Sequence, residues 1–274
     1  MIPSITLNDG NTIPQLGFGT FLVAPEDAER VVSDALEVGY RHIDTAAFYG
    51  NEEGVGRAIA GSGIPREEIF LTTKLWQDRH EDADKALAES LERLGTDYVD
   101  LYLIHWPAPM RDKYTTAWKT MVQQRDKGLT KSIGVCNFLP EHLDKLESSS
   151  DVTPVVNQIE LHPFFQQWKD VDAAKVHSIA VEAWHPLAQF KRDFTEIPEI
   201  MEPAEAHGKT PAQVVLRWHI QNGTIVFPKT NHVERMRENM DIFDFELTQK
   251  EMEGIISLDE GDDGRIGFHP NERE

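Results

Sequence analysis

Residues 99–105 read Val-Asp-Leu-Tyr-Leu-Ile-His, a largely apolar run that ends in a histidine. A short run of this kind predicts a strand. Seven further runs are strand candidates, over residues 15–19, 41–44, 69–74, 132–135, 155–160, 180–184 and 224–228. Because the runs alternate with segments of helical period, they favour a parallel sheet. Eight strands within so short a chain favour closure into a (β/α)8 TIM barrel.

The segments between the runs carry helix signals. Apolar residues recur at helical spacing at Ala83, Leu87, Leu91 and Leu94. Thr248 and Glu251 have the spacing of a capping box, which predicts the start of the last helix. Gly39 and Gly128 stand where helix C-caps are expected, just before predicted strands. These signals agree with a chain in which strands and helices alternate.

The N-terminal residues predict a β-hairpin. Apolar residues lie on both sides of Asp9-Gly10, a dipeptide typical of tight hairpin turns. No change of composition along the chain suggests a linker. We therefore expect residues 1–274 to form a single barrel domain with an N-terminal β-hairpin.

The composition limits the classes of function. The 274 residues include 27 Lys and Arg against 47 Asp and Glu, a formal net charge of −20. We expect neither nucleic acid nor an anionic membrane as a partner, because both attract basic surfaces.

No run is long enough to span a membrane, and no signal peptide is visible. Cys136 is the only cysteine, which fits a reducing compartment. We expect a cytoplasmic protein and, since no large apolar stripe is obvious, a monomer.

In a barrel of this kind, functional residues follow the carboxyl ends of the strands. Three neighbouring strands end in Asp44, Lys74 and His105, and Tyr49 lies five residues after the first. A charged lysine favours a nearby phenolate, so we expect Lys74 to lower the pKa of Tyr49 from about 10. Asp44 would keep the lysine charged. The four residues predict a general acid that protonates a carbonyl oxygen while a cofactor delivers hydride to the carbon.

Each of the four residues also has a structural interpretation. Asp44 is compatible with a helix cap, Lys74 with a solvated strand end, Tyr49 with packing and His105 with a buried core histidine. Their occurrence together at the ends of three adjacent strands favours the catalytic interpretation. No metal ligands are predicted, because the chain has no His-x-His, no His-Glu-x-x-His and no cysteine pair.

A group of basic residues follows the last predicted strand. Lys229, Arg235 and Arg237 lie close to Thr230 and Asn231, near a predicted helix N-terminus. Barrels often bind phosphate after their last two strands, so this segment is a candidate phosphate site. The alternative is a set of solvated charges on a helix. No stretch completes the glycine fingerprint of a Rossmann domain or a P-loop.

Several stretches together resemble the aldo-keto reductase family. They are GYRHIDTA (39–46), YGNE (49–52), TTKLW (72–76), DLYLIHWP (100–107), IGVCNF (133–138), NQIELHP (157–163) and FPKT (227–230), followed by Arg235 and Asn239. The resemblance covers nearly the whole chain, and the closest likeness is to 2,5-diketo-D-gluconate reductases. It implies a (β/α)8 barrel that binds NADPH and reduces aldehyde or ketone carbonyls to alcohols. Candidate substrates are 2,5-diketo-D-gluconate and similar small carbonyls.

The resemblance also implies roles for individual residues. Tyr49 would donate the proton, Asp44 and Lys74 would adjust the pKa of Tyr49, and His105 would orient the carbonyl. The residues implied in NADPH binding are Thr20, Asp44, Cys136, Asn137, Gln158, Trp184, Leu187, Gln189, Lys229, Thr230, Asn231, Arg235 and Asn239. The residues implied in substrate binding are Phe21, Phe48, Tyr49, Trp76, His105 and Trp106.

The chain departs from the family pattern in three places. Cys136 stands where serine is usual, which weakens one contact to the nicotinamide carboxamide. His185 replaces a small residue, and Ala188 and Phe190 replace glycines in the loop expected beside the pyrophosphate. The connection over residues 107–113 is short, which predicts an open pocket for small carbonyls.

Two other functions fit parts of the pattern. A Schiff-base aldolase on the same barrel would use Lys74 as its nucleophile and would need no nicotinamide. A non-catalytic nucleotide sensor would need no general acid, so the intact catalytic set argues against it. Asn137, Gln158 and Trp184 fit only the reductase.

Overall fold

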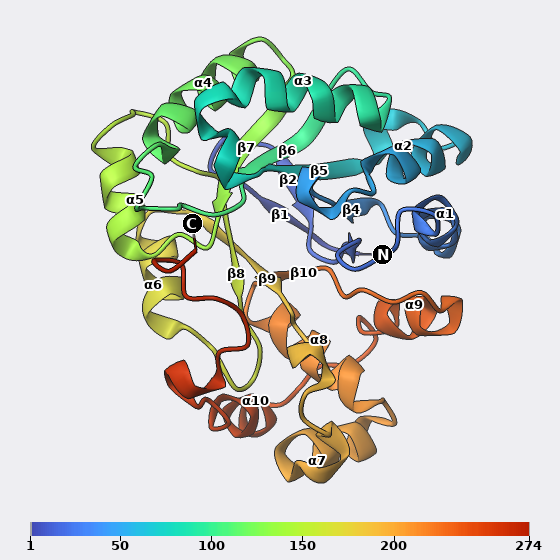
Figure 1. Ribbon diagram of the computed structural model, residues 1–274. Coiled ribbons are helices and arrows are strands. Elements are labelled where there is room, and N and C mark those ends of the chain that lie inside the picture. The colour runs from blue at the N-terminus through green and yellow to red at the C-terminus, as the bar shows by residue number, and fades with distance from the viewer. Residues whose placement is uncertain (1, 274) are drawn as a thin grey trace.

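The barrel strands lie side by side in the order of the chain. The computed structural model of the protein describes residues 2–273. Within them, eight parallel strands pair in the order β10-β9-β8-β7-β6-β5-β4-β3. Leu16 pairs with Val226 of β10, which closes the sheet into a barrel. The predicted (β/α)8 fold is confirmed (Figure 1).

All eight predicted strands occur, with somewhat different ends. They are β3 (Phe18–Gly19), β4 (His42–Asp44), β5 (Phe70–Leu75), β6 (Val99–Ile104), β7 (Thr130–Cys136), β8 (Val156–Glu160), β9 (Ala180–Trp184) and β10 (Ile225–Val226). β3 and β10, the first and last barrel strands, have two residues each. Where these two strands meet, isolated backbone hydrogen bonds join β10 to the residues just before β3. Gly17 N donates to Val226 O at 2.8 Å, and Val226 N donates to Gln15 O at 3.0 Å.

Helices connect the strands and cover the outside of the barrel. They are α1 (Ala28–Val38), α2 (Glu52–Gly61), α3 (Ala83–Leu94), α4 (Tyr114–Asp126), α5 (Pro140–Glu147), α6 (Trp168–Val176), α7 (Pro198–His207), α8 (Pro211–Gln221), α9 (Val233–Met240) and α10 (Gln249–Ile256). Figure 1 shows α2, α3 and α4 on one side of the strands and α7, α8 and α10 on the other. The predicted capping box of α10 is confirmed, since Thr248 and Glu251 exchange hydrogen bonds.

Alternate residues of β6 face the two sides of the barrel wall. Leu101 and Leu103 belong to the interior cluster, together with Cys136 of β7. Tyr102 and Ile104 belong to the layer between the strands and the helices. This alternation follows from the two-residue period of a strand, and it makes the barrel interior a packed core.

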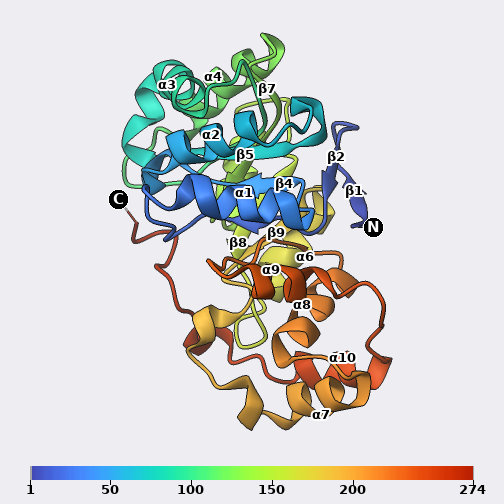
Figure 2. The ribbon, with the colours of Figure 1, turned by 90° about the vertical axis from the view of Figure 1, so that its right-hand side faces the viewer.

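The predicted hairpin is confirmed and covers the amino-terminal end of the barrel. β1 (Ser4–Thr6) pairs antiparallel with β2 (Thr12–Pro14). Leu7 and Ile13 pack into the interior cluster of the barrel. Figure 2 shows the hairpin at one end of the barrel and the C-terminal residues at the opposite end.

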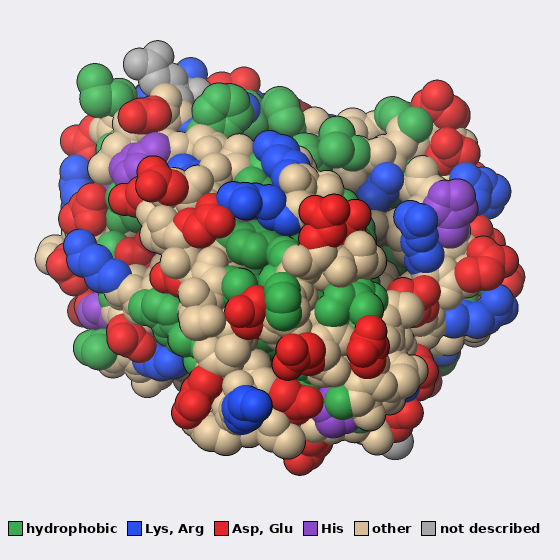
Figure 3. Space-filling model, turned by 90° about the horizontal axis from the view of Figure 1, so that it is seen from below, with side chains coloured by type: hydrophobic (Ala, Val, Ile, Leu, Met, Phe, Trp, Pro, Cys, Tyr) green, Lys and Arg blue, Asp and Glu red, His purple; other side chains and the backbone are tan. Residues whose placement is uncertain are grey.

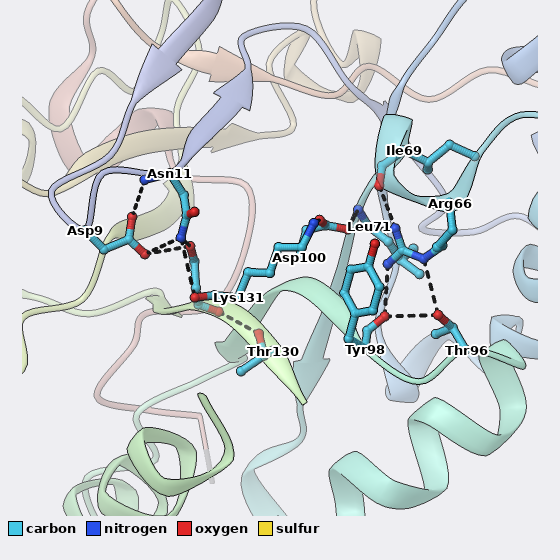
Figure 4. Close-up of polar contacts among 11 residues, drawn as sticks. Asp9, Asn11, Arg66, Ile69, Leu71, Thr96, Tyr98, Asp100, Thr130 and Lys131 are labelled. Carbon is cyan, nitrogen blue, oxygen red and sulfur yellow. Dashed lines mark hydrogen bonds and ion pairs between the residues drawn. The ribbon is translucent and has the colours of Figure 1, made fainter. Parts of the chain in front are cut away.

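Asp100 ties neighbouring strands together at the amino-terminal end. Its carboxylate accepts from Arg66 Nη1 at 2.8 Å and from Leu71 N at 3.0 Å, and it pairs with Lys131 Nζ at 2.8 Å (Figure 4). The ring of Tyr98 lies 4.3 Å from Arg66 Cζ and 4.6 Å from Lys131 Nζ. Asp100 therefore holds the barrel together at the end opposite the predicted site.

The surface reflects the acidic composition. On the face that carries α7 and α10, acidic side chains are scattered among polar and apolar ones (Figure 3). The basic side chains on this face do not form a continuous stripe. Within residues 2–273, none of the helices has the length and apolar character needed to cross a membrane.

Candidate active site

The carboxyl ends of β4, β5 and β6 bring the four predicted catalytic residues together. Asp44 ends β4, Lys74 lies next to the last residue of β5, and His105 follows β6. Tyr49 ends a short helical turn after β4. Its hydroxyl lies 3.4 Å from Lys74 Nζ, and its ring centroid lies 5.7 Å from that of His105.

Lys74 is completely buried and is held by oxygen atoms. Its Nζ donates to Asp44 Oδ1 at 2.6 Å and to Thr45 O at 2.8 Å. Burial by itself would lower the pKa of Lys74, but the charge of Asp44 raises it above its ordinary value. The ammonium therefore stays charged. A Schiff-base nucleophile needs a neutral amine, so this environment argues against the aldolase alternative.

The expected lowering of the Tyr49 pKa is wrong for the protein alone. Burial raises the pKa of Tyr49 to about 12, and the charge of Lys74 offsets only part of that increase. The hydroxyl thus carries its proton throughout the neutral range. Tyr49 is still a far stronger acid than an alcohol, whose pKa resembles that of water at about 15.7.

His105 is neutral in this site. Burial, with the charges of Lys74 and Arg273, holds its pKa well below the ordinary value. A neutral imidazole has one N–H donor for a carbonyl oxygen and leaves the proton transfer to a stronger donor. Its side chain packs edge-on to Trp76, with 5.0 Å between the ring centroids.

Gln158 connects Asp44, one of the predicted catalytic residues, to a second carboxyl group, that of Glu182. Its Nε2 donates to Asp44 Oδ2 at 2.9 Å and to Glu182 Oε2 at 2.8 Å. Both amide protons are therefore used, and its carbonyl oxygen is left to face a ligand. Glu182 is fully buried in β9, and burial, reinforced by the charge of Asp44, raises the pKa of Glu182 to about 8.

Three residues predicted to bind nicotinamide lie together after β7, in β8 and at the end of β9. Asn137 N donates to Gln158 O at 2.9 Å, and Trp184 Nε1 donates to Asn137 Oδ1 at 2.9 Å. Asn137 Nδ2 also donates to His105 O at 2.9 Å, which joins this group to the predicted catalytic residues. Cys136, at the end of β7, is buried beside them.

The predicted phosphate-binding residues lie around the start of α9. Lys229 and Arg235 are exposed, and neither forms an ion pair with another residue of the described chain. Thr230 Oγ1 accepts from His232 N at 3.2 Å, and Asn231 Oδ1 is buried without a partner. Two unpaired cations beside an unsatisfied polar atom and a helix N-terminus fit an anionic group such as a nucleotide phosphate.

The remaining predicted cofactor residues occupy the same end of the barrel. Thr20 is buried and its Oγ1 donates to Asp44 O at 3.1 Å. Asn239 is buried in α9, and Leu187 is buried in the loop after β9. Gln189 Nε2 donates to His185 Nε2 in that loop.

The loop after β9 keeps a glycine-like backbone without glycines. His185, Ala188, Gln189 and Phe190 all have φ between 50° and 53°. Non-glycine residues seldom adopt such angles, and each costs about 1 kcal/mol. His185, Ala188 and Phe190, which depart from the family pattern, therefore all lie in the left-handed backbone region that glycine adopts most easily.

Aromatic rings form the walls around Tyr49 and His105. Phe48 stacks on Trp76 with 3.7 Å between centroids, and Phe21 lies 5.1 Å from Tyr49. The two phenylalanine side chains are partly exposed. Trp106 is buried, 6.5 Å from Trp184. The structure thus brings all the predicted substrate residues to one end of the barrel.

Within residues 2–273, no group of three or more His, Cys, Asp or Glu is arranged to hold a metal ion.

Sequence reasoning missed several residues of this site. Glu182 is two residues before Trp184 in one strand, so the two-residue period could have placed both on the same side. Asn51 Nδ2 donates to Thr20 O and Val23 O and fixes the loops beside Tyr49. Glu160 binds the C-terminal tail, a contact between residues more than 100 positions apart that no local pattern reveals.

Comparisons with known proteins find similar sequences and similar folds. The sequence model of the Aldo/keto reductase family matches residues 15–260. An aldo-keto reductase of Mycolicibacterium smegmatis is 52% identical over 272 residues, covering 98% of each chain. Methylglyoxal reductase DkgA of Escherichia coli is 48% identical over 268 residues, covering 98% of this chain and 97% of that one. A crystal structure of a Gox0644 mutant in complex with NADPH has a TM-score of 0.95 and 43% identity, covering 100% of this chain and 99% of the other.

Proposed function

We propose that this chain, which belongs to the aldo/keto reductase family and is an NADP(H)-dependent oxidoreductase of carbonyl groups, reduces small aldehydes and ketones with Tyr49 as its general acid. The observation that carries the proposal is the contact of the Tyr49 hydroxyl with the buried, charged Lys74, with His105 alongside. Dicarbonyls such as methylglyoxal and sugar keto acids such as 2,5-diketo-D-gluconate are substrates to test first.

The residues divide the chemistry between them. NADPH, when bound, supplies hydride to the carbonyl carbon. The N–H of neutral His105 orients the carbonyl oxygen, and the Tyr49 hydroxyl gives its proton to that oxygen. The products are an alcohol and a tyrosinate, whose negative charge lies beside the Lys74 ammonium. Solvent then returns the proton to Tyr49. The ion pair of Lys74 with Asp44 keeps the ammonium in place.

The cofactor would lie along the carboxyl ends of β7 to β10. Asn137 and Gln158 would hold the carboxamide, and Trp184 would stack against the nicotinamide ring. Lys229, Thr230 and Arg235 would hold the 2′-phosphate, because the two cations lack a carboxylate partner within residues 2–273.

Replacing Tyr49 tests the acid assignment. Tyr49→Phe should lower kcat with methylglyoxal by roughly a hundredfold or more, since a positioned general acid contributes about that much. The quenching of tryptophan fluorescence by NADPH should give nearly the same Kd as for the unchanged protein. Turnover that survives in Tyr49→Phe would assign the proton to another group.

Replacing Arg235 tests the place of the cofactor phosphate. Arg235→Ala should weaken NADPH binding by roughly tenfold and NADH binding much less, because only NADPH carries the 2′-phosphate. Parallel fluorescence titrations measure both Kd values. Lys250→Ala, which removes an exposed cation from α10, is the control. Equal losses for the two cofactors in Arg235→Ala would place the phosphate elsewhere.

A further inference from the structure

Arg273, the last residue that the structure describes, lies beside the aromatic rings that form the walls of the predicted substrate pocket. Arg273 Cζ is 5.5 Å from the ring centroid of Trp76 and 6.0 Å from that of Trp106. It is also 4.5 Å from the ring of Phe268 in the same tail. The charge of Arg273 contributes to the low pKa of His105, so the guanidinium acts on the catalytic group across a short distance.

The tail is fixed in this position by several contacts. Glu160 accepts from Ile266 N at 2.7 Å and from Gly267 N at 2.9 Å. Gly267 also lies against Trp184, where a Cβ would come within 2.5 Å of the indole ring. A turn follows, in which Glu272 N donates to His269 O at 3.0 Å and directs the chain back over the pocket. The placement of Arg273 is therefore a property of the folded barrel.

Arg273 has no anionic partner within residues 2–273. Its Nε is buried without a hydrogen-bond partner, and no acidic side chain there pairs with it. Other arginines near the tail are paired: Arg265 with Asp262 at 3.0 Å, and Arg192 with Glu260 at 2.6 Å. In a protein with a net charge of −20, an unpaired arginine above the reactive residues marks a place for an anion.

We infer that Arg273 binds a carboxylate of the substrate, so that carbonyl compounds bearing a distant carboxylate are the preferred class. The inference rests on the proposed function, because it places the carbonyl of the same molecule at Tyr49 and His105. Arg273 and His105 both lie near the ring of Trp76, at 5.5 Å and 5.0 Å from its centroid, and they do not contact each other directly, so we expect the carboxylate to be several bonds from the carbonyl. The cations predicted to hold NADPH follow β10, and Arg273 is a separate charge on the substrate side.

A pair of probes that differ only in charge tests the inference. 4-Formylbenzoate carries a carboxylate across the ring from its aldehyde, and its methyl ester is the neutral match. The measured quantity is the ratio of kcat/KM for the acid to kcat/KM for the ester. Arg273→Met should lower this ratio by about tenfold, and Arg273→Lys should restore part of it, because lysine keeps the charge without the planar fork.

The controls separate the competing explanations. Arg265→Met removes a paired arginine from the same tail and should leave the ratio unchanged. A ratio that stays the same in Arg273→Met overturns the inference, even if both kcat/KM values fall. A parallel loss of NADPH affinity in Arg273→Met would assign the cation to the cofactor and overturn it as well. If the unchanged protein reduces neither probe nor methylglyoxal, the proposed function itself fails.

Discussion

At the scale of single residues, the site depends on the balance of charge around Lys74. Asp44 and Glu182 both hydrogen-bond to Gln158, but one ammonium neutralises only one carboxylate. The raised pKa of Glu182 keeps it protonated at neutral pH, so the buried charges of Asp44 and Lys74 cancel. Cys136 is also neutral, because burial raises the pKa of its thiol well above the usual value.

Glu182→Gln should change how stability depends on pH. Between about pH 4.5 and pH 8 the unfolded chain loses the Glu182 proton while the folded chain retains it. Stability of the unchanged protein therefore falls as pH rises through this window, by an amount on the order of a few kcal/mol. Glutamine removes that dependence, so the Tm difference, variant minus unchanged protein, should grow from pH 5 to pH 8.

Thermal unfolding at several pH values measures this difference. Glu253→Gln, at an exposed position of α10, is the control and should show no such trend. A Tm difference that stays constant from pH 5 to pH 8 would mean that Glu182 is ionised in the folded protein.

The sequence was a good guide to which residues meet and a poor guide to their environment. Asp44, Lys74 and His105 end adjacent strands, so their meeting followed from the fold. The pKa of Tyr49 did not follow, because it depends on how deeply the hydroxyl is buried, and neighbours far along the chain set that depth. Glu182 and Arg273 were missed for the same reason.

At the scale of elements, the strands form from local sequence signals, whereas the position of the C-terminal tail depends on a contact with a residue far along the chain. The strands have local signals, and all eight were predictable from apolar runs. The tail, residues 259–273, has little regular structure and is held by Glu160 at the end of β8. Hydrogen bonds from His162, Gly267 and Ile266 outweigh the effect of burial and lower the pKa of Glu160.

Glu160→Gln should loosen the tail and leave the barrel intact. The variant replaces one carboxylate acceptor by an amide donor, so the amides of Ile266 and Gly267 cannot both be satisfied. We expect faster hydrogen exchange at residues 265–270, by roughly tenfold, with unchanged protection of β5 and β6. Mass-spectrometric hydrogen exchange resolves these segments. Equal exchange in the variant would show that packing of Gly267 against Trp184 is sufficient to hold the tail.

The same anchor should respond to acid. Because the folded pKa of Glu160 is depressed, its contribution to stability is present above the ordinary carboxyl range and is lost as pH falls below it. The protection factors of the tail amides in the unchanged protein should therefore fall at low pH before those of the strand amides do.

At the scale of the whole molecule, the two ends of the barrel have separate tasks. The carboxyl end carries the proposed catalytic residues, and the amino end is closed by the hairpin and the contacts of Asp100 (Figure 4). Mutations at the amino end should therefore affect stability and leave the chemistry unchanged.

Asp100→Asn should lower stability by about 2 kcal/mol, because it leaves Arg66 and Lys131 without their shared anion. For a chain of this length the Tm should fall by roughly 3–4 °C. The value of kcat measured well below the Tm should not change. Asp151→Asn, at an exposed loop position, is the control and should leave the Tm within about 1 °C. A large loss of kcat in Asp100→Asn would contradict the separation of the two ends.

The opposite placement of the hairpin and Arg273 has a practical consequence for handling the protein (Figure 2). A purification tag at the C-terminal end would be attached at the end of the chain where Arg273 lies beside the rings of Trp76 and Trp106. Attachment through the N-terminal side instead fixes the barrel by its closed end. A bead or electrode that captures the protein in this way would hold each molecule with its reactive mouth directed toward the solution.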